Sequence, residues 1–155
     1  MSLTAVACGP QNAAPSRTPP APVDRVDVVA LEAEPTALNW DDAPGLDGVK
    51  LRVTFFQMAQ PQPVLGSGTV DILLFEKPVS KASVATTKPF FTWSFTARNM
   101  SQFYVRDMVG WRYVMPLSWG GRPPHSGDIN LVARYRAASG AVIYSDIVSV
   151  AMTAK

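Results

Sequence analysis

The dominant pattern in the chain is an alternation of apolar and polar residues with a period of two, which is typical of β-strands that bury one face. In residues 49–55 the odd positions are apolar and the even ones polar. Residues 91–97 alternate in the same way and place Trp93 on the inner face between two phenylalanines. No window carries the apolar stripe of a long amphipathic helix, so the sequence predicts at most a single helical turn, near residues 99–103.

Three further segments are predicted to be strands. Residues 111–119 alternate, but Pro116 lacks the N–H that a central ladder needs, so this strand should lie at an edge or carry a bulge at that point. Residues 66–77 are apolar on both faces after Asp71, as expected of a central strand beneath loops. A shorter strand is expected within residues 23–31.

The C-terminal segment, residues 128–152, is predicted to be a hairpin with its turn at residues 137–140. One parity of the return strand is apolar, namely Val142, Tyr144, Val148, Val150 and Met152. Asp146 falls on that parity, so either a buried donor satisfies its carboxylate or a bulge near Ser145 shifts the phase and leaves it in water. The bulge is favoured because an unpaired buried carboxylate is expensive.

Together these segments predict one all-β domain over residues 23–155, an antiparallel Greek-key β-sandwich of immunoglobulin-like or related type with about seven strands. A chain of 155 residues is long enough for such a core without metal or disulfide support. It has one cysteine and one histidine, which excludes an intramolecular disulfide and a cysteine or two-histidine zinc site. We expect no metal and no cofactor.

The N-terminus differs from the rest in composition. Residues 1–8 are mostly small and apolar and end at Cys8, and residues 9–22 contain five prolines. The first segment resembles the end of a bacterial lipoprotein signal, with Ala5 where a leucine is usual; the resemblance implies that Cys8 is the lipid-attachment residue. Residues 9–22 would then be a tether that spans roughly 40 Å as polyproline II. The alternative is a disordered terminus with an incidental thiol.

The whole layout resembles small bacterial envelope lipoproteins of uncharacterised function. The resemblance lies in the cysteine, the Pro/Ala tether and the single sandwich, with weak motifs at residues 24–28 and 47–51 and at Gly140. It implies a location in the cell envelope, anchored to a membrane through Cys8 and exposed to the periplasm or the surface. Because Gly9 rather than an aspartate follows the cysteine, it favours the outer membrane.

Most catalytic and nucleic-acid functions are disfavoured by composition. His125 is the single candidate base and lies in a Gly- and Pro-rich segment that predicts a solvated loop, and no nucleophile-elbow motif is present. The net charge is +2 with no run of basic residues, so no nucleic-acid partner is expected. Asp41, Asp42 and Asp47 could contribute to a calcium site, but their spacing favours a turn. The chain is not expected to be an enzyme.

Two functions remain open. The first is a non-catalytic envelope module for protein–protein contact or structural support, whose partner is an unknown envelope protein. Its candidate partner-binding residues are Trp40 and Arg122, because they lie in the long loops 38–48 and 120–128 and are of the types most often found at interface hot spots. The alternative is a carbohydrate-binding module, which would present two or three exposed coplanar aromatic rings.

Overall fold

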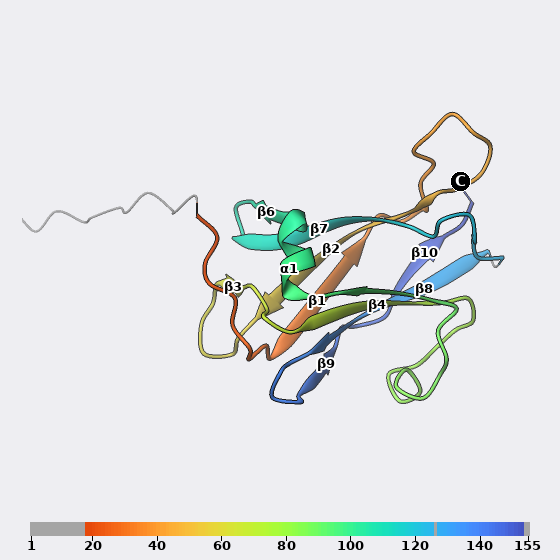
Figure 1. Ribbon diagram of the computed structural model, residues 1–155. Helices are drawn as coiled ribbons and strands as arrows, with labels where there is room; N and C mark the ends of the chain where they lie inside the picture. The colour runs from red at the N-terminus through yellow and green to blue at the C-terminus, as the bar shows by residue number, and fades with distance from the viewer. Residues whose placement is uncertain (1–17, 126, 154–155) are drawn as a thin grey trace, which may run out of the picture.

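The computed structural model describes residues 18–125 and 127–153, which form two antiparallel β-sheets packed face to face (Figure 1). The first sheet contains β1 (Val28–Ala33), β2 (Gly48–Phe56), β3 (Pro63–Val64), β6 (Tyr104–Arg106) and β7 (Trp111–Ser118). The second contains β4 (Thr69–Phe75), β5 (Phe91–Phe95), β8 (Asp128–Arg136), β9 (Val142–Tyr144) and β10 (Val148–Ala151). The predicted all-β sandwich is confirmed.

The order of the strands is that of an immunoglobulin-like Greek key. The first sheet runs β1-β2-β7-β6, with β3 paired to β2, and the second runs β10-β8-β4-β5, with β9 paired to β8. The chain therefore forms a pair in one sheet, crosses to form a pair in the other, and returns. The described chain has more strands than the seven expected. The additional ones, β3, β6 and β9, are only two or three residues long.

The main core lies between the sheets and follows the predicted alternation. The inward side chains of β2, β7 and β8 are almost completely buried, with at most 3% exposure from Val49, Leu51, Val53, Phe55, Tyr113, Met115, Leu117, Ile129, Leu131, Ala133 and Tyr135. Trp93 and its two neighbouring phenylalanines on β5 also face this core, but they are half-buried because β5 is an edge strand.

The strand predicted at residues 66–77 is central and covered on both faces, as expected. Leu73 and Phe75 of β4 form a second apolar cluster with Val84 and Val132, under the loop of residues 76–90. The expected helical turn is also present, as α1 (Ala97–Met100) followed by the short helix η1 (Ser101–Phe103). No helix in the described part of the chain is long and apolar enough to cross a membrane.

The return strand carries the predicted bulge. β9 pairs Tyr144 with Arg134, whereas β10 pairs Val148 with Leu131, so one extra residue lies between the two strands. Asp146 is consequently in water, with its side chain 79% exposed and 2.5 Å from the Lys81 ammonium. The prediction that Val142 lies on the same inner face as Val148 and Val150 was wrong, because the bulge turns the side chains of β9 to the opposite faces. Val142 is exposed, and Ile143 instead packs on the main core.

β7 is not an edge strand, because it lies between β2 and β6, but the open side that Pro116 requires is present at its C-terminal half. The N–H of Trp119 donates to the carbonyl of Asp47 at 3.2 Å, so residue 119 faces β2. Since neighbouring residues in a strand point their amides to opposite sides, Pro116 and Ser118 face away from β2. The β6 ladder ends at Tyr113 and does not reach them. The indole N–H of Trp93 covers part of this edge by donating to the Ser118 carbonyl at 2.8 Å.

Candidate functional site

The loops that carry the candidate partner-binding residues meet at one end of the sandwich. The indole N–H of Trp119 donates to the Leu46 carbonyl at 2.8 Å and thereby joins residues 38–48 to residues 119–125. These two loops, which we call the distal pole, lie opposite the end at which the described chain begins (Figure 1). The sequence could not predict that the two loops would be neighbours.

The loop of residues 38–48 is shaped by its own carboxylates. The Asp47 carboxylate accepts a hydrogen bond from the N–H of Trp40 at 2.6 Å, and the Asp41 carboxylate accepts one from the N–H of Ala43 at 2.8 Å. Both side chains therefore stabilise turns, in agreement with the turn interpretation. Among residues 18–125 and 127–153, no group of three or more His, Cys, Asp or Glu side chains is placed to hold a metal ion.

Trp40 is presented at the surface in a fixed position. Its side chain is 44% exposed, and its ring lies over Gly48, where an added Cβ would come within 2.7 Å of the ring atom Cη2. A side chain at position 48 would meet the Leu117 carbonyl oxygen at 2.0 Å as well as the ring, so this glycine permits the close approach. Trp40 is therefore both exposed and held against the loop, which suits a contact residue.

Arg122 is exposed on the neighbouring loop. Two glycines precede it with left-handed backbone, Gly120 at φ +59° and Gly121 at φ +82°, and the N–H of Arg122 donates to the Trp119 carbonyl at 3.2 Å. The turn is therefore tight and keeps the backbone of Arg122 beside the Trp119 anchor. Trp40 and Arg122 are brought to the same end of the sandwich because the indole of Trp119 joins their two loops.

His125 is a solvated loop residue, as expected. Its side chain is 87% exposed, and its Nδ1 atom lies 3.3 Å from the Glu76 carboxylate. The same carboxylate accepts a hydrogen bond from the backbone N–H of His125 at 2.5 Å. Glu76, which the sequence did not single out, therefore ties the distal loop to the end of β4.

The four tryptophans differ in exposure. Trp119 is 2% exposed, and Trp93 and Trp111 are half-buried against the main core. Trp40 is the single exposed tryptophan of the chain. The tryptophans consequently provide no row of coplanar exposed rings for stacking against a sugar chain.

The outer face of the second sheet carries a buried carboxylate, Asp71, which was not predicted from the sequence as a polar site. Asp71 has no exposed side-chain surface and contacts Arg134 at 2.9 Å, Arg136 at 2.8 Å and the Ser94 hydroxyl at 2.6 Å. Although burial opposes ionisation, the hydrogen bonds from these three residues lower the pKa of Asp71 below its ordinary value. The signal was an aspartate in an otherwise apolar central strand, opposite a strand with two alternating arginines.

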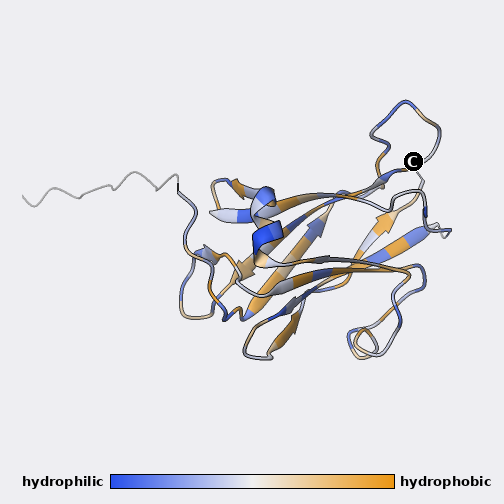
Figure 2. Cartoon of the chain, in the orientation of Figure 1, coloured by the Kyte–Doolittle hydropathy of each residue, from blue (hydrophilic) through white to orange (hydrophobic). Residues whose placement is uncertain are grey.

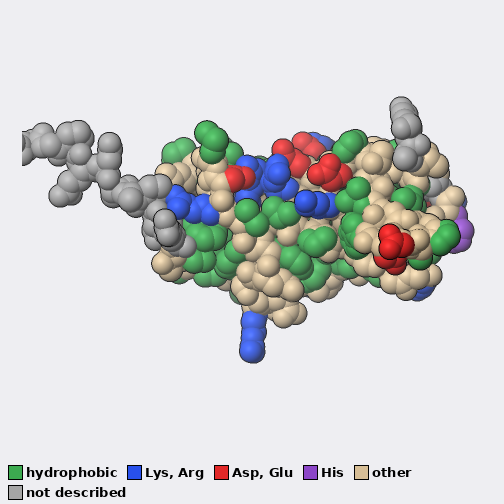
Figure 3. Space-filling model, turned by 90° about the horizontal axis from the view of Figure 1, so that it is seen from above, with side chains coloured by type: hydrophobic (Ala, Val, Ile, Leu, Met, Phe, Trp, Pro, Cys, Tyr) green, Lys and Arg blue, Asp and Glu red, His purple; other side chains and the backbone are tan. Residues whose placement is uncertain are grey.

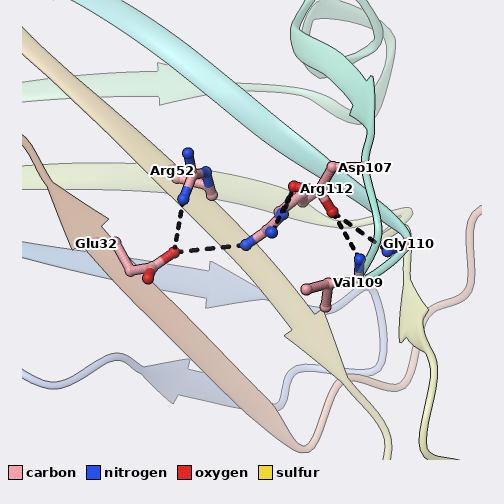
Figure 4. A network of polar contacts seen from close by, with 6 residues as sticks. All are labelled: Glu32, Arg52, Asp107, Val109, Gly110 and Arg112. Carbon is pink, nitrogen blue, oxygen red and sulfur yellow. Dashed lines mark hydrogen bonds and ion pairs between the residues drawn. The ribbon is translucent and has the colours of Figure 1, made fainter.

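A second polar network covers the outer face of the first sheet (Figure 4). Arg112 contacts Asp107 and lies 3.5 Å from the Glu32 carboxylate, which also contacts Arg52 at 3.4 Å. In the space-filling view, acidic and basic side chains lie next to one another over the middle of the molecule rather than in separate patches (Figure 3). Such mixed charge gives no steering field of one sign.

Cys8 lies outside the described residues, as do residues 9–17 of the expected tether. Residues 18–22 are described and are exposed. No protein-family model matches the chain, and no curated protein or solved structure matches it either.

Proposed function

We propose that this chain is a non-catalytic binding module of the cell envelope that contacts a partner protein through Trp40 and Arg122. The observation that carries the proposal is the fixed, exposed position of Trp40 beside the loop of Arg122, with Trp119 joining the two loops. Tryptophan and arginine contribute most when they are rigidly presented, because less conformational entropy is lost on binding.

We propose further that Cys8 carries a lipid that anchors the module to a membrane. The support is the cysteine at the end of a small apolar segment and the proline-rich stretch that follows it. The chain enters the sandwich at the end opposite the distal pole. An anchored molecule would therefore hold Trp40 and Arg122 away from the membrane, where a partner can reach them.

The carbohydrate-binding alternative has less support. Sugar-binding faces use several aromatic rings, and one exposed tryptophan supplies only one. Binding of soluble glycans that is abolished by Trp40→Ala would restore this alternative.

Site-specific photo-crosslinking tests the protein contact. A photoreactive residue placed at position 122 should give a defined covalent adduct in cells. The same residue at Arg25, which is 75% exposed and whose carbonyl accepts a hydrogen bond from Gln57 beside the β2–β3 turn, serves as the control. The adduct from position 122 should be lost when Trp40→Ala is added. Equal adducts from both positions, or an adduct that Trp40→Ala leaves unchanged, would contradict the assignment of the distal pole.

Cell fractionation tests the anchor separately. The full gene product should move from the membrane to the soluble fraction when Cys8 is replaced by serine, because lipid chains contribute about 0.8 kcal/mol per buried methylene. Unchanged membrane association of Cys8→Ser would refute the lipid anchor without affecting the assignment of the distal pole.

A further inference from the structure

The exposed large apolar side chains are concentrated at one end of the molecule. We call this end, where residues 18–24 meet the β2–β3 turn, the β6–β7 hairpin and the β8–β9 turn, the proximal pole (Figures 1 and 2). Seven large apolar residues in the described chain are markedly exposed, and Trp40 is the one that lies at the distal pole. The other six lie on strand ends and turns of the proximal pole, namely Val28, Met58, Val105, Met108, Val109 and Val142.

Hydrogen bonds and an ion pair at Asp107 hold the apolar tip of the β6–β7 hairpin outward. Asp107 accepts hydrogen bonds from the N–H groups of Val109 at 2.9 Å and Gly110 at 3.4 Å, and Arg112 fixes the Asp107 carboxylate from the other side (Figure 4). The side chain of Arg112 is only 12% exposed. This turn therefore presents Met108 fully exposed and Val109 50% exposed, and neither side chain packs in the main core.

Met58 is held in the same way on the neighbouring turn. Its N–H donates to the Asp27 carboxylate at 2.8 Å, and its side chain is 80% exposed. The two turns touch, since a Cβ on Gly110 would lie 3.0 Å from the ring of Pro63. Both aspartates at these turns accept internal hydrogen bonds, and the two methionines and Val109 are the large apolar groups exposed there.

A groove adjoins these tips. It has a volume of about 860 Å³ and is bordered by residues 18–21, by Pro63 and Val64, and by Met108 and Trp111. The same segment that leads back towards Cys8 thus forms one wall of the groove. The ten residue steps from Thr18 to Cys8 span at most about 35 Å when fully extended, so an anchor at Cys8 lets this pole reach the membrane and limits how far it can move away.

We propose that the proximal pole is a lipid-contacting surface that rests Met58, Met108 and Val109 in the interfacial region of the bilayer to which Cys8 is attached. This inference rests on the proposed anchor. Apolar tips a few ångströms deep are typical of proteins that lie on a membrane, and they act together with a lipid chain as a second attachment. A protein partner at this pole would have to compete with a membrane that lies within reach of the N-terminal segment.

The test uses the whole chain and makes the anchor artificially, so that its outcome does not depend on acylation in cells. Cys8 is the only cysteine, so the chain can be coupled there to maleimide-bearing lipid in vesicles of phosphatidylethanolamine and phosphatidylglycerol. Met58 and Met108 are the native probes, because hydrogen peroxide oxidises exposed methionines and mass spectrometry measures the rate at each one. Chain coupled at Cys8 to a soluble polymer is the reference.

We expect both methionines to be oxidised at least about fivefold more slowly on vesicles than on the polymer, as partial burial in lipid requires. Val109→Asp should abolish this protection at Met108, since a carboxylate resists entry into the bilayer, whereas Trp40→Ala at the distal pole should leave it unchanged. Equal oxidation rates on vesicles and polymer would overturn the lipid-contacting surface. Protection that appears only when a cell extract is added would assign the pole to a protein partner instead.

Discussion

Tyr113 and Tyr135, which belong to opposite sheets, hold the same turn from two sides. The Tyr113 hydroxyl oxygen accepts a hydrogen bond from the N–H of Gly66, and the Tyr135 hydroxyl oxygen accepts one from the N–H of Gly68, each at 3.0 Å. Phe55 lies between the two rings, with centroids 5.2 Å and 5.1 Å away. The entry to β4 is therefore fixed by both sheets at once.

The buried tyrosines should make the protein sensitive to alkali. Burial raises the pKa of Tyr113, so the folded state keeps the phenol neutral where the unfolded state ionises. The free energy of unfolding is therefore unaffected by ionisation of this tyrosine below the unfolded pKa of about 10, and it falls as the pH rises above that value. Urea unfolding should show a falling free energy of unfolding above about pH 10, with a shallower fall in Tyr113→Phe. An equally steep fall in the variant would contradict this assignment.

Gly66 should tolerate no side chain. An added Cβ would lie 2.6 Å from the Tyr135 ring and 2.9 Å from the Phe55 ring, both of which are packed in the core. Gly66→Ala is expected to destabilise the fold by about 2 kcal/mol, as overpacked cores do. Gly127→Ala is the matched control, because nothing lies within 4 Å of its added Cβ. Chemical denaturation of the two variants would disprove the clash if their losses were equal.

Asp71→Asn should be strongly destabilising at neutral pH. The change leaves Arg134 and Arg136 facing a neutral amide on the sheet, and breaking a buried ion pair from one side costs about 3 kcal/mol or more. Because the pKa of Asp71 is lowered, its stabilisation is present above the unfolded pKa of about 4 and is lost as the pH falls through the folded value. Thermal unfolding from neutral to acidic pH should therefore bring the wild type closer to Asp71→Asn. A constant gap between them would count against the ion pairs.

The two tryptophans that bind backbone carbonyls should differ in importance. Trp119 is almost fully buried, and Trp119→Ala should cost about 3 to 5 kcal/mol. Trp93 faces the same core, but its half-buried position on edge strand β5 lowers the expected cost of Trp93→Ala to about 2 kcal/mol. Trp93→Phe should lose about 1 kcal/mol through its hydrogen bond to Ser118. Unfolding free energies in which Trp93→Ala exceeds Trp119→Ala would reverse this order.

The sandwich class and most inward faces could be predicted because alternation is local. The bulge at Asp146 could also be predicted, because a carboxylate on the apolar face of a strand is unfavourable unless the strand shifts to expose it to water. Its effect on Val142 could not, because the reversal of phase depends on how β8 pairs with both halves of the return strand. The contact between residues 46 and 119 joins distant parts of the chain and left no periodic signal.

The display of Met58 and Met108 was equally hidden in the sequence. Met58 follows a glutamine and Met108 follows an aspartate in short turns, and exposed apolar residues of this kind are ordinary on protein surfaces. The two methionines form one surface only because they lie at the same pole, and that pole is assembled from turns about fifty residues apart in the chain.

The attachment of the N-terminal segment has a mechanical consequence. The N–H of Val23 donates to the Leu65 carbonyl at 2.7 Å, the Val23 carbonyl accepts from the N–H of Ser67 at 2.8 Å, and the Asp24 carbonyl accepts from the Tyr135 hydroxyl at 2.8 Å. A pull on residues 18–22 is therefore borne first by this small clamp, which links the tether to both sheets, before β1 carries any load. Tension applied between this segment and the far end of the molecule would strain the clamp while the loops of the distal pole keep their shape.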